Sequence, residues 1–273
     1  MVFNSYSFLV FFLAVLGLYY GPLRSHWRAQ KQMLLVASYA FYAAWNPPFV
    51  VLLWLSTVVD WFLAKGIHRS ENQRHRKALL TISLCLNLGL LAFFKYANFA
   101  LENFQVLAES FGIAYEPPEV DIFLPIGISF YTFQTLSYTL DIYRRKAEPW
   151  GSFLDYALYV TFFPQLVAGP IVRAVDFKDQ CTAPRRATAD QFTWGVVLMV
   201  LGLFNKLIIA DAILAPLADK SFNHPDAMGF GDAWIGTLAF AGQIYGDFAG
   251  YSICAIGVAL CLGFSLPDNF RHP

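Results

Sequence analysis

The sequence predicts an all-α, polytopic integral membrane protein with about seven transmembrane helices plus a re-entrant or broken helical segment. Hydrophobic residues make up 57% of the 273 and charged residues 14%, whereas soluble domains carry about 25% charged residues. The mean hydropathy is +0.48, and several charge-free stretches are long enough to cross a bilayer. The formal net charge is zero, so no field attracts a polyanion and we expect no nucleic-acid partner.

The first charge-free stretch covers residues 1–23; its apolar run begins at Phe3 with no Lys or Arg before it, and the first basic residue is Arg24. A secretory signal normally begins with basic residues, so we interpret Phe3–Tyr20 as a retained first helix. Later stretches that are apolar and nearly free of charge predict six further spans, because an ionised side chain at mid-bilayer is costly. These spans are residues 32–45, 49–65, 78–94, 122–141, 190–213 and 234–263.

Two places in this series depart from a plain span. Asn46-Pro47-Pro48 interrupts a longer charge-free run, since proline disfavours helix at and before itself. The last span, 234–263, is longer than one crossing needs and carries Asp247 near its middle. It therefore tilts strongly or breaks there, and a second crossing would place the chain's end outside.

Residues 152–172 predict the broken segment. Phe162-Phe163-Pro164-Gln165 and Gly169-Pro170 lie within one charge-free run. Backbone that is not helical cannot face lipid with unpaired groups, so it is expected inside protein or around a wet cavity. Gln165 and Arg173 flank this break and are candidates for a substrate path.

The loop charges predict an orientation. Lys and Arg concentrate in four segments, 21–31, 66–77, 144–150 and 173–189, and the loops between them are acidic or uncharged. Lys and Arg favour the cytoplasmic side. All four segments share that side if residues 152–172 enter and return without crossing, which places the N-terminus outside.

Polar residues inside the predicted spans are the remaining candidates for function, since each is costly unless paired or facing water. Gln243 and Asp247 are four residues apart on one helix face and could bond each other, and Tyr251 continues that face. They would line a cavity or form a buried structural cluster. Lys206 and Asp211 are five apart, a poor spacing for a pair on one α-helix, so Lys206 pairs with an acid on another helix or snorkels. For Asp60 and Asp141, near basic residues, we expect interfacial ion pairs.

No histidine lies inside a predicted span, so no catalytic histidine is assigned. The four cysteines lack metal-ligand spacing and we expect no metal site; they are interpreted as packing residues. Phosphate-loop, nucleophile-elbow and zinc-protease motifs are absent from the sequence.

Six strings, in order, resemble the alginate O-acetyltransferase branch of the membrane-bound O-acyltransferase family. They are Phe41 to Pro47 (FYAAWNP), Leu124 to Gln134 (LPIGISFYTFQ), Phe163 to Ile171 (FPQLVAGPI), Lys206 with Ile209-Ala210-Asp211, Gln243 to Gly257, and Pro267 to Pro273 (PDNFRHP). The resemblance covers essentially the whole chain and adds Gln134 to the substrate-path candidates.

The resemblance implies an enzyme of the bacterial cytoplasmic membrane. Such enzymes take an acyl group from a cytoplasmic donor, acetyl-CoA or another acyl thioester, and pass it to hydroxyls of an extracytoplasmic polysaccharide. They bind no cofactor and usually work with a periplasmic or extracellular partner protein.

The family's presumed catalytic histidine belongs to a motif that follows the last of these strings, and this sequence ends at Pro273. We therefore expect residues 1–273 to form a single transmembrane domain truncated before that motif, inactive alone. The alternatives are a membrane transporter or channel, which the broken segment and intramembrane polar residues also suit, or an inactive scaffold.

Overall fold

The computed structural model describes residues 1–115, 122–223 and 228–270, and every regular element in them is a helix. The chain divides into two compact units, which are described separately. Unit 1 comprises Met1–Pro47 and Ala157–Pro273, and unit 2 comprises Pro48–Tyr156. The all-α prediction is therefore confirmed.

Unit 1 begins with α1 (Tyr6–Tyr20) and α2 (Trp27–Ala43). Ser5 starts α1, because its Oγ accepts a hydrogen bond from the backbone N–H of Phe8 at 3.1 Å, which satisfies one of the unpaired donors of the first turn. The aromatic rings of Phe8, Phe11, Phe41 and Phe163 pack together at centroid distances of 5.3–6.3 Å. The first two helices are thus joined to the chain's second half by aromatic packing.

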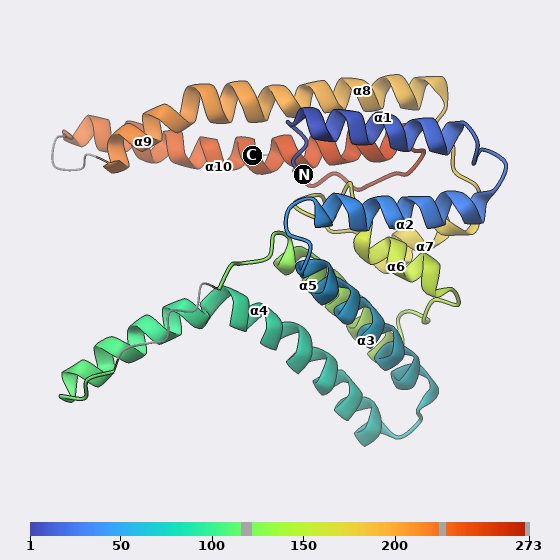
Figure 1. Cartoon of the computed structure of the whole chain (residues 1–273), viewed down its shortest axis with the longest axis horizontal. Helices are drawn as coiled ribbons and strands as arrows, with labels where there is room; N and C mark the ends of the chain where they lie inside the picture. Colours follow the sequence, from blue (N-terminus) through green and yellow to red (C-terminus); the bar gives the residue numbers. More distant parts are fainter. Residues whose placement is uncertain (116–121, 224–227, 271–273) are drawn as a thin grey trace. The chain divides into compact units, whose positions relative to one another are not determined.

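A long antiparallel helix pair forms the largest remaining part of unit 1 (Figure 1). Its first member runs through α8 (Ala189–Phe204), the π-helix η1 (Asn205–Leu214) and α9 (Ala215–Asn223). Its second member is α10 (Phe230–Cys261), one continuous helix of 32 residues. The sequence left open whether this last span breaks near Asp247; α10 does not break there.

Glycines let this pair approach closely. A Cβ added at Gly257 would lie 2.4 Å from the carbonyl oxygen of Gly195, and one added at Gly202 would lie 2.5 Å from that of Gly250. Gly195 and Gly202, like Gly250 and Gly257, are seven residues apart, which is two helical turns. Small residues at such spacing allow backbone contact between helices in lipid, where packing rather than hydrophobic burial drives association.

Unit 2 packs α3 (Phe49–Arg69), α4 (Gln73–Ser110) and α5 (Ile128–Tyr143) against one another. Then α6 (Phe153–Thr161) carries the chain back to unit 1, where the short α7 (Ala174–Thr182) follows. The sequence did not predict α7, a nine-residue helix within a basic segment. Helix α4 also runs well past the expected end of its span at residue 94. The charges of Lys95 and Glu102 are unfavourable in lipid, but neither residue disrupts helical backbone, so the helix continues beyond the apolar stretch.

Asp60 lies at the core of unit 2. Its side chain is 0% exposed, and it accepts hydrogen bonds from Ser83 Oγ at 2.6 Å and Asn87 Nδ2 at 2.8 Å. Asn87 Oδ1 in turn accepts from Ser56 Oγ at 2.9 Å. The expected interfacial ion pair is therefore wrong for Asp60, which accepts hydrogen bonds from neutral side chains. Asp141 likewise forms no ion pair with the residues that the structure describes.

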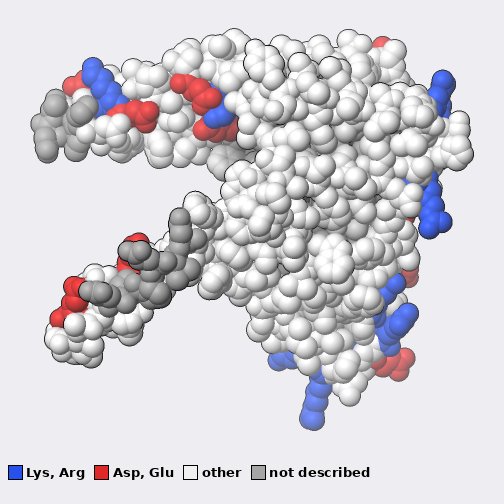
Figure 2. Space-filling model, in the orientation of Figure 1, with Lys and Arg blue, Asp and Glu red and all other residues white. Residues whose placement is uncertain are grey.

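Among the described residues, four helical stretches are long and apolar enough to cross a membrane. They are Phe49–Arg69, Gln73–Ser110, Ala189–Asn223 and Phe230–Cys261; α1 is apolar but shorter. Most of the surface over α8 and α10 in Figure 2 is white, free of charged side chains. A multi-pass membrane protein is supported, and the count of seven crossings stays a prediction.

Within each unit, basic segments lie side by side. In unit 1, Arg186 Nη2 donates to the carbonyl of Arg24 at 2.6 Å, and Tyr19 Oη donates to that of Arg185 at 2.8 Å. In unit 2, Arg145 donates to the carbonyls of His68 and Ser70 at 3.1 and 3.2 Å. Segments 21–31 and 173–189 therefore share one end of unit 1, and segments 66–77 and 144–150 share one end of unit 2. Sidedness stays a prediction, and residues 116–121 and 224–227 of the acidic loops lie outside the described residues.

Candidate functional site

The break after α6 is buried inside unit 1. Phe162, Phe163, Gln165 and Leu166 are each at most 2% exposed. The backbone N–H of Phe163 donates to Ser38 Oγ at 3.1 Å, and those of Gln165 and Leu166 donate to the carbonyl of Phe162. Non-helical backbone is thus satisfied by protein, as its depth in an apolar molecule requires.

Gln165 holds this segment in place and keeps one polar atom open. Its Nε2 donates to the carbonyl of Tyr159 at 2.6 Å, while its Oε1 is buried and accepts no hydrogen bond from the described residues. Arg173 lies at the far end of the segment, exposed, where α7 begins. The two candidates flanking the break therefore differ: one is buried and one faces outward.

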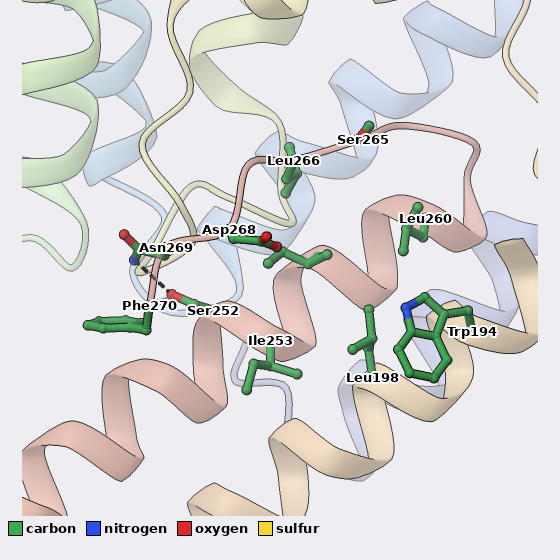
Figure 3. A pocket seen from close by; sticks show the side chains of 11 residues that line it. Trp194, Leu198, Ser252, Ile253, Leu260, Ser265, Leu266, Asp268, Asn269 and Phe270 are labelled. Carbon is green, nitrogen blue, oxygen red and sulfur yellow. Dashed lines mark hydrogen bonds between the residues drawn. The ribbon is translucent and has the colours of Figure 1, made fainter. Parts of the chain in front are cut away.

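The break is connected to a cavity through Ser252 on α10. Ser252 Oγ donates to the carbonyl of Ala168 at 3.4 Å and accepts from Asn269 Nδ2 at 3.0 Å. Figure 3 shows this pair. Asn269 lies on the non-helical segment that follows α10 and runs back along it. Neither residue was a candidate from the sequence. Both lie in strings that resemble the family, but both are uncharged, and an uncharged polar side chain is a weaker signal of function in a membrane span than a charged one.

The cavity has a volume of about 620 Å³. Trp194 and Leu198 of α8 and Ile253 of α10 form its apolar side, and Ser265, Asp268 and Asn269 supply polar groups from the returning segment (Figure 3). A cavity that is apolar on one side and polar on the other suits an amphipathic ligand. Residues 271–273 at the end of the returning segment, including His272, lie outside the described residues, as does His224.

A charged cluster lies where η1 meets α10. Lys206 Nζ donates to Asp211 Oδ1 at 2.8 Å and to Asp247 Oδ1 at 2.6 Å. The three side chains are 34%, 40% and 33% exposed. The expected pairing of Lys206 with an acid on another helix is confirmed, and Asp247 is hydrogen-bonded as expected, although its partner is Lys206 rather than Gln243.

The π-helix explains how Lys206 also reaches Asp211. Five residues exceed one turn of α-helix, so α-helical geometry does not bring Lys206 and Asp211 together. In a π-helix the backbone bonds join residues five apart, so side chains at that spacing lie roughly one turn above each other. Helix periodicity alone does not predict a π-helix, and π-helical turns are frequent at functional sites.

The remaining candidates are placed as follows. Tyr251 shares with Lys206 the lining of a second, smaller cavity. Gln243 lies half-buried on α10, one turn before Asp247. Gln134 is 4% exposed on α5 in unit 2. Among the described residues, no three His, Cys, Asp or Glu side chains are grouped so that they could hold a metal ion.

Comparisons with known proteins point to one family. The model of the membrane-bound O-acyltransferase family matches residues 3–273. The probable alginate O-acetylase AlgI of Azotobacter vinelandii is 41% identical over 280 residues, which cover all of this chain and 54% of the relative. The peptidoglycan O-acetyltransferase of Helicobacter pylori is 33% identical over 302 residues, covering all of this chain and 56% of that protein.

A more distant relative shares part of the chain. The teichoic acid D-alanyltransferase of Bacillus subtilis is 26% identical over 152 residues, which cover 54% of this chain and 38% of that protein. The chain spans about half the length of the first relatives it matches.

Proposed function

Because the chain belongs to the membrane-bound O-acyltransferase family, we propose that it contributes the acyl-transfer machinery of a bacterial inner-membrane enzyme that acylates an extracytoplasmic polysaccharide. The observation that carries this proposal is the family match over residues 3–273. Relatives that match the whole chain carry names of acetyl transfer to alginate or peptidoglycan. An acetyl group is therefore the proposed cargo.

The donor is proposed to be acetyl-CoA or another acyl thioester on the cytoplasmic side, and the acceptor a polysaccharide hydroxyl outside. We propose that a periplasmic or extracellular partner protein completes the transfer. The buried break at Phe162–Pro170 and the cavity beside Ser252 support a path through the protein, since irregular backbone at depth is tolerated around such paths. The path candidates remain Gln134, Gln165, Arg173, Lys206, Gln243, Asp247 and Tyr251.

We also propose that residues 1–273 act as one transmembrane domain. Unit 1 is assembled from both parts of the chain, 1–47 and 157–273, so neither part is complete without the other. No residue of this chain is assigned as catalytic. Acyl transfer to a hydroxyl needs a base within hydrogen-bond reach, and the helices that the structure describes as candidate spans place a histidine only at their ends, at His68 and His75.

The test is transfer of labelled acetyl from acetyl-CoA to polysaccharide in membrane vesicles. Two proteins are compared: residues 1–273, and the same residues joined to the C-terminal remainder of the Azotobacter relative. Alginate, peptidoglycan and teichoic acid are offered in turn, with a periplasmic extract of the acceptor's source supplying the partner. We expect incorporation by the joined chain and none by residues 1–273 alone.

Two results would overturn parts of this proposal. If the joined chain transfers no acetyl to any acceptor, the proposed function is wrong. If residues 1–273 turn over at a rate comparable to the joined chain, they hold the base themselves, and Asp211 and Asp247 are the carboxylates to replace first.

A further inference from the structure

A second cavity of unit 1 lies beside the charged cluster, distinct from the cavity of Figure 3. Its volume is about 210 Å³. Val2, Phe3 and Asn4 lie on one side, and Leu203, Lys206, Gly250, Tyr251 and Cys254 line the rest. At about 30 Å³ per water molecule, this space equals roughly seven waters, so it suits a group of a few heavy atoms.

Residues 2–4, which form one wall of the cavity, are held in place by packing. Phe3 is 7% exposed and stacks on Tyr251 with a centroid distance of 4.4 Å and an interplanar angle of 24°. It also contacts Phe8 of α1 and Phe41 of α2, at 4.8 and 6.1 Å. Ring stacks of this kind are stabilising beyond their buried area, so Phe3 fixes this wall of the cavity to the core of unit 1.

Lys206 brings the one charged group into this lining. An ammonium group has three donors; one bonds Asp211 and one bonds Asp247. The third has no partner among the residues that the structure describes. The cavity therefore combines largely apolar walls with a donor that the two carboxylates hold in a fixed position.

The net charge of Lys206, Asp211 and Asp247 determines which hydrogen-bond acceptors can bind the third proton of Lys206. Two carboxylates and one ammonium leave a formal negative charge, so a third anion at Lys206 would be repelled. A neutral carbonyl oxygen meets the donor without that cost, and a short alkyl group fits the apolar walls. A carbonyl on a small apolar group is what an acyl thioester presents at its reactive end.

We propose that this cavity binds the acyl end of the donor, with the carbonyl oxygen accepting a hydrogen bond from the third proton of Lys206, and that its volume restricts the acyl group to a few carbons. This inference rests on the proposed function and adds to it a site for the transferred group. Lys206 binds substrate in this arrangement, and Asp211 and Asp247 position it.

Photolabelling tests the site without requiring transfer. The probe is a butyryl thioester of propanethiol with a diazirine on the acyl chain, applied to residues 1–273 in detergent, and crosslinks are mapped by peptide mass spectrometry. We expect labelling within residues 2–4, 203–206 and 250–254. The matched thioether, which lacks the carbonyl, should label these residues at least fivefold less, since a hydrogen bond to a charged group is lost.

Leu203 lines the cavity, so Leu203→Phe narrows it. Leu207→Phe is the control, because Leu207 does not line the cavity and is 40% exposed. We expect labelling to fall at least fivefold in L203F and to stay unchanged in L207F, with both variants melting within a few degrees of the parent. Unlabelled acetyl and butyryl thioesters should compete with the probe, and an octanoyl thioester should not.

The inference is overturned if L203F labels as the parent does, if the thioether labels equally well, or if the octanoyl thioester competes as strongly as the acetyl one. If L203F fails to fold, the thioether comparison and the competition series on the parent chain still decide. Selective labelling without acetyl transfer by the joined chain would retain the acyl site and reject the proposed function. Transfer without selective labelling would do the reverse.

Discussion

At the scale of single residues, a carboxylate is accommodated in two different ways. Asp60 forms no ion pair with any residue that the structure describes, and it is bonded to Ser83 and Asn87 in a site that is 0% exposed. Asp247 is a third exposed and bonds the ammonium of Lys206. A buried acid needs its donors supplied by the fold, because an unsatisfied charged group costs far more than an unsatisfied neutral one.

Replacing Asn87 by Ala should therefore destabilise unit 2 strongly. The change removes one donor to Asp60 and the acceptor of Ser56 Oγ together. We predict a loss of about 2–3 kcal/mol, measured as a lower melting temperature in detergent. Asn103→Ala is the control, since Asn103 is exposed and donates only to the carbonyl of Phe99; it should change stability by less than about 0.5 kcal/mol. Equal effects of the two variants would contradict this role for Asn87.

At the scale of helices, the approach of α8 to α10 depends on the absence of side chains at Gly195, Gly202, Gly250 and Gly257. Each is a position where a Cβ would lie 2.4–2.7 Å from backbone of the opposite helix. The charged cluster lies farther along the same helix pair, with Lys206 and Asp211 in η1, which continues α8, and Asp247 in α10. The helix spacing set by glycine therefore also sets the distance between Lys206 and Asp247.

Gly257→Ala should push the two helices apart. Its Cβ would lie 2.4 Å from the carbonyl oxygen of Gly195, a backbone atom that cannot move alone. We predict a loss of about 2–3 kcal/mol, typical of overpacking, seen as a lower melting temperature. Gly89→Ala in α4 has nothing within 4 Å of the added Cβ and should stabilise slightly through helix propensity. A G257A protein as stable as G89A would show that the close packing is not required.

Much of the helix pattern could be predicted from the sequence, for reasons visible in particular elements. Asn46-Pro47-Pro48 separates α2 from α3, and the break at Pro164 to Pro170 is where proline and glycine predicted it. The π-helix and the Lys206–Asp211 pair could not be predicted, because the five-residue spacing has meaning only in that geometry. The prediction of an ion pair for Asp60 is wrong because nearness to basic residues in the sequence does not show which face of the helix carries a side chain. Asp60 faces the core of unit 2.

At the scale of the whole molecule, the four basic segments define the orientation to be tested. They pair within each unit through Arg186 with Arg24 and through Arg145 with Ser70. We predict that all four face the cytoplasm. The measurement uses single cysteines at Ser25 and Arg74 in a chain whose four native cysteines are replaced, labelled in intact cells with an impermeant maleimide.

Neither Ser25→Cys nor Arg74→Cys should react until the cells are opened. Ser110→Cys, at the opposite end of α4 from Arg74, is the matched control and should react in intact cells. Labelling of Ser25→Cys and Arg74→Cys from outside would reverse the orientation. Labelling of only one of them would place the two units' basic ends on opposite sides.

The discontinuity of unit 1 has a consequence for biogenesis. Tyr19 and Lys31 bond the carbonyls of Arg185 and Cys181, partners 166 and 150 residues later in the chain. At about 5–20 residues per second, a ribosome needs roughly 8–30 s to make that interval. During this time α1 and α2 stay in the bilayer with their later neighbours not yet synthesised. Lys31, 9% exposed in the folded protein, therefore lacks its bond to Cys181 during this time and is expected to stay at the lipid–water boundary.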